Sequence, residues 1–148
     1  MTSTQPSVHT PEADLVIGFL HALERSDLDS ALAMVAEDLV YTNVSLPTIH
    51  GRRGLDRAFR PLFRPRRMGF AVRVHYVATD KDVVLTDRTD EISLGRFRAR
   101  FWVYGRFVVR DGHIAVWRDS FDWLDVTVGM LRALVGLVVP AANRQMPN

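Results

Sequence analysis

The spacing of apolar and polar residues divides the chain into a helical first part and a second part made of strands. In the first part apolar residues recur every three or four positions, whereas from Gly69 onward they alternate with polar residues. The first helix is predicted to begin at Pro11, which is tolerated in a first turn, with Thr10 as its N-cap. Its apolar stripe comprises Leu15, Val16, Phe19, Leu20 and Leu23.

Two further helices are predicted before the strands begin. The second runs from Ser26, whose hydroxyl is expected to cap it, to near Asp38. An extended segment at 39–46 follows, and a third helix is expected over 54–62, before Pro65 ends it. The second helix is expected to bury Leu28, Leu32 and Val35.

Strand-like segments and a final helix make up the rest of the chain. Asp111-Gly112 is a typical hairpin turn between the last two strands. A closing helix is predicted over 127–139, capped by Asp125 or Thr127. The strands are predicted over 69–78, 83–92, 96–109 and 113–124, and one face of the first carries Phe70, Val72, Val74 and Tyr76.

Helices followed by a run of strands indicate the α+β class. We expect a strongly curved, mixed but mainly antiparallel sheet that forms a cone against the N-terminal helices, with a helix at the C-terminus. The inside of such a cone is a pocket. A chain of 148 residues suffices for one core, so a single domain over 11–140 is expected between a flexible segment, 1–10, and a tail, 141–148.

The composition argues against several kinds of site. The chain has no cysteine, which excludes disulfides and thiolate chemistry, and its five histidines lie at no metal-ligand spacing. Arginines gather at 51–67, but the net charge is only +2 and no nucleic-acid-reading motif accompanies them. The start of the chain lacks a signal-peptide core, and the apolar segment at 129–142 is shorter than the roughly 20 residues of a membrane helix. We therefore expect a cytoplasmic protein with no metal, no nucleic acid partner and no membrane insertion.

Three predicted strands each place polar groups on an otherwise apolar face. Side chains two apart share a face, so Arg88 and Asp90 point the same way, among apolar neighbours. Asp119 stands alone among the inward residues of the last strand, and Tyr41 and Asn43 share one face of the extended segment. These five residues are the candidate catalytic set.

A buried charge needs a partner, so we expect Arg88 to bridge Asp90 and Asp119. The guanidinium keeps its proton, and two neighbouring carboxylates raise the pKa of one of them. The favoured arrangement has one acid protonated and the other ionised, which is an acid and a base at a fixed separation. Such a pair suits a reaction that protonates one oxygen while deprotonating a water, which Tyr41 and Asn43 could position.

An apolar pocket is expected around this cluster to hold an apolar substrate. Each feature also has an ordinary structural explanation, such as an ion pair for Arg88 and Asp90, a turn cap for Asp119, and a core for the aromatic residues. The residues alone therefore leave catalysis and structural pairing open. The predicted pocket residues are Trp117, Phe121, Trp123, Phe101 and Phe107.

Taken together, these motifs resemble the limonene epoxide hydrolase family, whose members have the cone fold of the nuclear-transport-factor and ketosteroid-isomerase superfamily. The resemblance spans most of the domain and is carried by Tyr41-x-Asn43, Arg88-x-Asp90 and the Asp119 of Trp-Arg-Asp, in that order. It implies that Asp119 is the base that activates a water held by Tyr41 and Asn43. Protonated Asp90 would donate to the epoxide oxygen, with Arg88 bridging the two acids.

The resemblance also implies the substrate class and the partners. A bulky apolar epoxide, such as a terpenoid, sterol-like or fatty-chain epoxide, would be opened by water in one step to a vicinal diol. It further implies a homodimer with no metal or organic cofactor, and it leaves open a role in detoxification, degradation or biosynthesis. The superfamily offers two alternatives, an isomerase-type protein and a non-catalytic protein that binds an apolar, steroid-like ligand. The isomerase is disfavoured because the first helix has no tyrosine to serve as oxyanion donor.

Overall fold

The computed structural model describes residues 10–64 and 68–142. Apart from Thr10, Ala141 and Ala142, the predicted terminal segments lie outside these residues, as does Pro65. The elements are α1 (Pro11–Glu24), α2 (Leu28–Ala33), β1 (Val35–Asn43), β2 (Ile49–His50), α3 (Arg52–Phe59), β3 (Gly69–Asp80), β4 (Val83–Leu94), β5 (Phe97–Arg110), β6 (His113–Ser120), α4 (Trp123–Val138) and a 3-10 helix, η1 (Pro140–Ala142).

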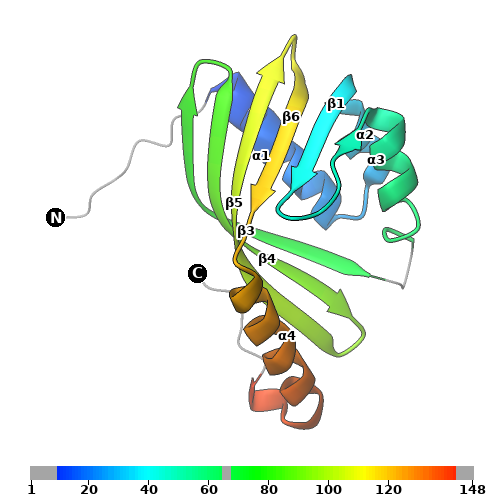
Figure 1. The fold of residues 1–148 in the computed structure, drawn as a ribbon, viewed down its shortest axis with the longest axis vertical. Helices are drawn as coiled ribbons and strands as arrows, with labels where there is room; N and C mark the ends of the chain where they lie inside the picture. The colour runs from blue at the N-terminus through cyan, green and yellow to red at the C-terminus, as the bar shows by residue number, and fades with distance from the viewer. Residues whose placement is uncertain (1–9, 65–67, 143–148) are drawn as a thin grey trace, which may run out of the picture.

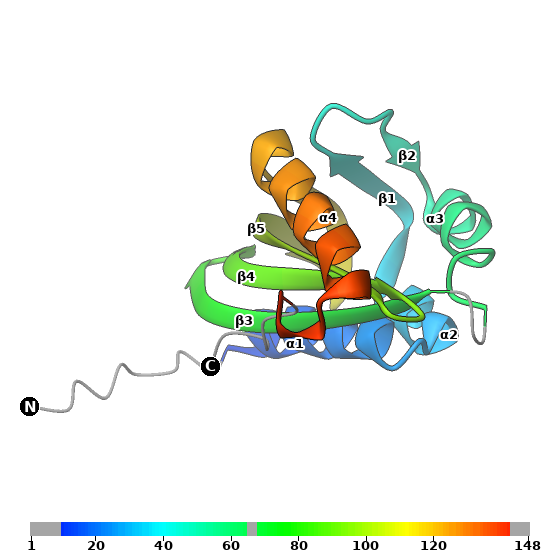
Figure 2. The same cartoon turned by 90° about the horizontal axis from the view of Figure 1, so that it is seen from below.

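The six strands form one curved sheet in the order β2-β1-β6-β5-β4-β3. β1 and β6 pair in parallel, and the other neighbouring strands pair antiparallel. The long strands β3, β4 and β5 curve round one side of the molecule, α1 lies along the sheet, and α4 stands near the ends of these strands (Figures 1 and 2). This architecture confirms the predicted α+β class.

α1 closes one side of the core. The Thr10 hydroxyl oxygen accepts a hydrogen bond from the backbone N–H of Ala13 at 3.2 Å, as its predicted N-cap role requires. The Phe19 ring packs edge-on against Trp117, with ring centroids 5.0 Å apart. The helix and its cap are confirmed, and its buried residues are Ala13, Val16, Phe19, Leu20, Ala22 and Leu23.

The second helix is shorter than predicted, and its cap is a different residue. Ser26 has a left-handed backbone with φ 57°, and the carboxylate of Asp27 instead accepts from the N–H of Ser30 at 3.1 Å. The helix ends at Ala33, and β1 begins at Val35, which pairs with Ile114 of β6. Pairing with β6 thus draws into the sheet residues that a local pattern assigned to the helix.

The third helix also begins earlier than predicted, because Gly51 supplies its turn. Gly51 has φ 79°, a left-handed conformation that favours glycine, and α3 starts at the next residue. The Arg52 guanidinium then donates to the backbone oxygen of Val35 through Nε and Nη2, at 3.0 and 2.6 Å. This contact ties the start of α3 to the first strand.

The last helix starts four residues before the predicted position and is capped by neither predicted residue. β6 ends at Ser120, and the carboxylate of Asp122 accepts from the N–H of Leu124 at 2.7 Å. Asp125 instead accepts from the backbone N–H of Trp102 at 2.8 Å, on the stretch of β5 that extends beyond its pairing with β6. Among the described helices, α4 included, none is long and apolar enough to cross a membrane.

A bulge in β3 overturns one predicted side-chain direction. The register with β4 shifts between Val74 and Tyr76, so the alternation is interrupted there. Tyr76 is 60% exposed, contrary to the prediction that it shares a face with the buried Val72, while Val77 packs against the core.

Candidate active site

A row of residues across three strands forms the floor of the site. Thr86 of β4 pairs with Gly105 of β5, which pairs in turn with Asp119 of β6. A Cβ atom at Gly105 would lie 2.3 Å from Arg88 Nη1 and 2.6 Å from the Thr86 hydroxyl oxygen. Glycine is therefore needed here so that the guanidinium can lie across β5. Thr86 and Gly105 were not among the predicted site residues, although a glycine that interrupts an inward-facing apolar row is a recognisable signal.

The Arg88 guanidinium joins the two predicted aspartates. Nε donates to Asp90 Oδ1 at 2.9 Å and Nη2 to Asp90 Oδ2 at 3.2 Å. Nη2 also donates to Asp119 Oδ2 at 2.7 Å, and Nη1 donates to the Thr86 hydroxyl at 3.2 Å. Arg88 is 0% exposed and each aspartate is 5% exposed. One buried cation therefore faces two buried acids.

The surplus of acid favours a bound proton. Burial raises the pKa of Asp90 from 3.8 to about 6, against the opposing effect of Arg88. Burial also disfavours the charge on Arg88, but the neighbouring Asp119 and Asp90 outweigh it and raise the pKa of the guanidinium above its ordinary value. The guanidinium thus stays charged while Asp90 tends to hold a proton, which is an acid poised near neutral pH.

β1 brings Tyr41 and Asn43 to the same place. In the parallel pairing of β1 with β6, Tyr41 lies opposite Trp117 and Asn43 opposite Asp119. The Asn43 amide Nδ2 donates to the Tyr41 hydroxyl oxygen at 3.0 Å. Burial, with Asp119 close by, raises the pKa of Tyr41, so this phenol stays neutral. The structure therefore brings all five candidate residues of the sequence analysis into one cluster.

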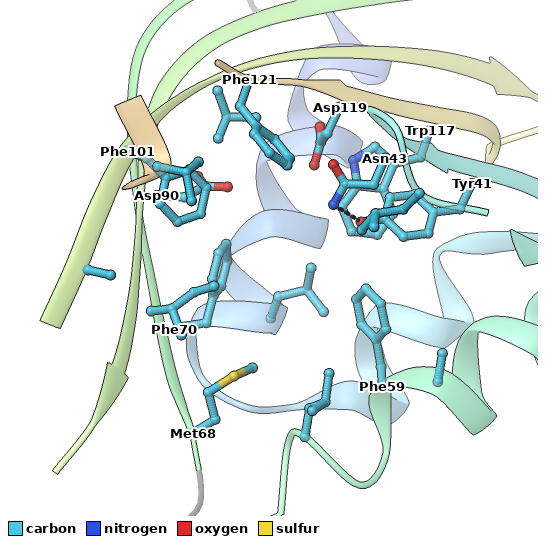
Figure 3. A pocket seen from close by; sticks show the side chains of 18 of the residues that line it. Tyr41, Asn43, Phe59, Met68, Phe70, Asp90, Phe101, Trp117, Asp119 and Phe121 are labelled. Atoms are coloured by element: carbon cyan, nitrogen blue, oxygen red, sulfur yellow. Dashed lines mark hydrogen bonds between the residues drawn. The ribbon is translucent and has the colours of Figure 1, made fainter. Parts of the chain in front are cut away.

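The cluster opens into an apolar cavity of about 520 Å³. Figure 3 shows Asp90 and Asp119 at its wall, with Asn43, Tyr41 and Trp117 beside Asp119. Four of the five predicted pocket residues line it, namely Trp117, Phe121, Trp123 and Phe101.

Phe107 is the predicted pocket residue that lies elsewhere. It is 0% exposed and stacks behind Trp117, with ring centroids 6.1 Å apart and with Phe19 of α1 at its edge. Alternation correctly placed Phe107 on the inward face, but α1 covers that part of the face, so the side chain belongs to the core.

Much of the cavity wall comes from segments that the sequence analysis did not connect with the site. α3 and the following turn supply the residues opposite the aspartates, and α4 supplies part of the rim. A strand pattern carries no information about these contacts, which arise from how the helices pack. The additional lining residues include Leu46, Ile49, Phe59, Leu62, Phe63, Met68, Phe70, Ile92, Val126 and Met130.

The acidic residues of the site do not form a metal-ligand set. Within 10–64 and 68–142, no three His, Cys, Asp or Glu side chains gather so that they could hold an ion. The arrangement can instead hold a proton on one carboxyl, accept a proton on the other, and present both to an apolar ligand.

The chain is similar to epoxide hydrolases over most of its length. The family model of the limonene-1,2-epoxide hydrolase catalytic domain matches residues 10–132. Epoxide hydrolase EphG of Mycobacterium tuberculosis is 44% identical over 126 residues, which cover 85% of this chain and 83% of that protein. The solved structure of an M. tuberculosis LEH-like epoxide hydrolase is 41% identical with a TM-score of 0.87, covering 92% of this chain and 96% of that chain. The chain is also similar in fold to an NTF2-like protein of unknown function from Burkholderia pseudomallei. The two are 16% identical with a TM-score of 0.71, and the match covers 82% of this chain and 98% of that chain.

Proposed function

Because this chain belongs to the limonene-1,2-epoxide hydrolase family, and so is an epoxide hydrolase of that type, we propose that it opens a bulky apolar epoxide with water in one step. The product is a vicinal diol. The observation that carries this mechanism is the pair of buried acids, Asp90 and Asp119, bridged by the single guanidinium of Arg88.

Asp119 is the base in this proposal. Its carboxylate takes a proton from a water, whose oxygen attacks an epoxide carbon while the bond from that carbon to the epoxide oxygen breaks. Tyr41 and Asn43 position the water, as their contact with each other beside Asp119 supports. No bond forms between the protein and the substrate.

Asp90 is the acid. Its pKa of about 6, raised by burial, supports a protonated carboxyl that can donate to the departing epoxide oxygen. After the reaction Asp119 holds the proton from water and Asp90 is ionised. A net transfer of one proton from Asp119 to Asp90 restores the starting state, and Arg88 keeps a positive charge next to both acids throughout.

The cavity supports an uncharged, bulky substrate. Its volume of about 520 Å³ lies within the roughly 300 to 1,000 Å³ of pockets that bind drug-sized ligands. Among the described lining residues, the two aspartates alone carry charged groups, so no cation in the wall would balance an anionic ligand. Terpenoid, sterol-like and fatty-chain epoxides fit this chemistry.

A homodimer is part of the proposal. α4 exposes apolar side chains along its outer side, among them Leu131 at 58% and Val138 at 83% exposure. Exposed apolar surface of this kind is typical of contact with a partner. Light scattering coupled to gel filtration measures the mass in solution, and a monomer at micromolar concentration would rule the dimer out.

A panel of terpenoid, sterol-like and fatty-chain epoxides, assayed for diol formation, tests the function. Asp90→Asn and Asp119→Asn should each lower the rate at least a hundredfold, since general acid–base catalysis contributes about 10² to 10⁴. Glu91→Gln is the matched control, because Glu91 is equally buried on the same strand but faces away from the cavity. Full activity in either aspartate variant would refute the assigned roles.

Labelled water tests the one-step route. A single turnover in heavy-oxygen water should place one heavy oxygen in each diol, because the attacking atom comes from solvent. An unlabelled diol would mean that a carboxylate oxygen of the protein had entered the product through a covalent ester. That result would overturn the mechanism while leaving the epoxide hydrolase activity intact.

A further inference from the structure

Three buried polar atoms beside the cavity have no hydrogen-bond partner in the part of the chain that the structure describes. They are the carbonyl oxygen Oδ1 of Asn43, the indole nitrogen Nε1 of Trp117 and the carboxylate oxygen Oδ1 of Asp119. Asn43 lies opposite Asp119 in the pairing of β1 with β6, and Trp117 is two residues before Asp119. Figure 3 shows the three side chains together at one corner of the cavity. The set comprises one donor and two acceptors.

The indole N–H of Trp117 is a group that packing does not explain. The ring is 3% exposed and lies among aromatic rings, with centroids 4.0 Å from Tyr41, 5.0 Å from Phe19 and 5.9 Å from Phe59. A purely apolar aromatic side chain would suit these neighbours. A buried N–H without a partner costs about 1 to 3 kcal/mol, so its presence points to a ligand at this corner.

We propose that the Trp117 indole N–H donates a hydrogen bond to the attacking water. A water has two hydrogens and two lone pairs. The hydrogens go to Asp119 Oδ1 and Asn43 Oδ1, one lone pair accepts from Trp117 Nε1, and the other lone pair is left to attack the epoxide carbon. Buried waters typically make about three hydrogen bonds, which is the number that this set offers. The inference rests on the proposed function and assigns a further residue to it.

Tyr41 takes a different role in this arrangement. Its hydroxyl oxygen accepts from Asn43 Nδ2 at 3.0 Å, which turns the other side of the amide, Oδ1, toward the water. If Tyr41 donated to the same water together with Trp117, both lone pairs would be engaged and none could attack. Tyr41 therefore positions Asn43, whereas Trp117 touches the reacting water.

The donor matters most as the reaction proceeds. When Asp119 removes a proton, negative charge develops on the water oxygen, and a hydrogen bond to a charged acceptor is about twice as strong as a neutral one. The N–H thus stabilises the transition state more than it stabilises the bound epoxide. Its loss should lower kcat by roughly tenfold to a hundredfold and leave KM nearly unchanged.

Replacing Trp117 with benzothienylalanine tests the proposal, because sulfur takes the place of the N–H with little change in ring shape. The substrate is limonene epoxide, or the fastest epoxide of the panel. The matched control is the same replacement at Trp102, which is 45% exposed and is not among the described residues that line the cavity. The Trp117 variant should lose kcat, whereas the Trp102 variant should keep the kcat and KM of the wild type.

Nuclear magnetic resonance supplies a second measurement that does not depend on turnover. The chain has three tryptophans, so its indole N–H signals are few enough to assign by substitution. The Trp117 signal in the wild type should show a cross-peak to a long-lived bound water.

Unchanged kcat in the Trp117 variant, or no water cross-peak in the wild type, would overturn the assignment of Trp117 while leaving the aspartate mechanism in place. A wild type that forms no diol from any epoxide would instead remove the proposed function itself, so the two failures are distinguishable.

Discussion

Asp90 and Glu91 are neighbouring residues of β4, and both carboxylates are buried, at 5% and 4% exposure. They face opposite sides of the sheet, where their surroundings differ. On the concave side Asp90 shares Arg88 with a second acid, Asp119. On the convex side Glu91 is paired with two arginines, Arg98 at 3.2 Å and Arg100.

The difference lies in charge balance and in access to water. The concave cluster has two acids for one cation, and the Arg88 side chain is only 1% exposed. The convex cluster has one acid for two cations, and the Arg98 side chain is 51% exposed, so water can solvate its charge. On the concave side, burial raises the pKa of Asp90 to about 6 against the lowering effect of Arg88, and the nearby Asp119 adds to the rise.

The largest expected effect comes from removing the buried cation. Arg88→Met leaves two acids facing each other, and losing one partner of a buried pair costs about 3 to 5 kcal/mol. The convex control, Arg98→Met, should change the free energy of unfolding by about 0.5 kcal/mol or less, because this arginine is half exposed. Urea denaturation at pH 7.5 measures both. Equal losses of unfolding free energy would mean that the buried Arg88 contributes no more to stability than the half-exposed Arg98.

The next effect is a pH dependence that belongs to the concave cluster. The pKa of Asp90 is raised by burial from 3.8 to about 6, so the folded protein binds this proton more tightly than the unfolded chain. The stability from the protonated acid is fully present below about pH 4 and is lost as the pH rises through about 6, up to about 3 kcal/mol in all. Subtracting the profile of Asp90→Asn from that of the wild type isolates this contribution.

The same proton should control the rate. If protonated Asp90 is the acid, kcat/KM falls as the pH rises through about 6, since kcat/KM reports the free enzyme. Glu91→Gln should keep this rate profile. A wild-type rate that stays level from pH 5 to 8 would contradict the role of Asp90.

A methyl group placed between the strands should disturb the concave cluster alone. Gly105→Ala puts a Cβ 2.3 Å from Arg88 Nη1, and overpacking of this kind costs about 1 to 3 kcal/mol. Because the guanidinium must move away from Asp119, diol formation should also be lost. Gly18→Ala is the control, with its nearest neighbour 3.8 Å away in a helix where alanine is favoured. A fully active Gly105→Ala would show that Arg88 need not lie across β5.

The smallest effect is expected on the convex side. Glu91→Gln removes the charge but leaves an acceptor near Arg98 and Arg100, so stability should fall by about 1 kcal/mol. Diol formation should stay within about twofold of the wild type. A large loss of activity would mean that the convex cluster takes part in the reaction.

The sequence was sufficient to predict the convergence of the charged residues because strand periodicity and the cost of burying charge act together. Arg88, Asp90 and Asp119 each fell on an apolar face, and an isolated buried ion is so unfavourable that the three had to meet. Thr86 and Gly105 were not predicted to belong to the cluster. They lie there because of the strand register, which depends on which residues of neighbouring strands pair.

Local patterns were less informative where competing contacts decide the outcome. Ser26 and Asp27 are both good N-caps, and the chain uses Asp27. Asp125 was expected to cap α4, but its carboxylate accepts from Trp102 of β5 instead, and Asp122 caps the helix. In both cases the tertiary structure, and not the local sequence, determines which side chain caps the helix.

The sequence by itself determined the class of fold, the inward faces of β4, β5 and β6 and the identity of the charged cluster, because side-chain alternation and the free energy of burial are local to each segment. Only the tertiary structure decided how deep each inward residue lies. Phe107 and Phe101 share a face of β5, yet α1 covers the first while the second lines the cavity, since depth depends on what packs over the sheet. Among the residues that the structure describes, tertiary packing likewise left the N–H of Trp117 without a hydrogen-bond partner, next to Asp119, which is proposed to activate water.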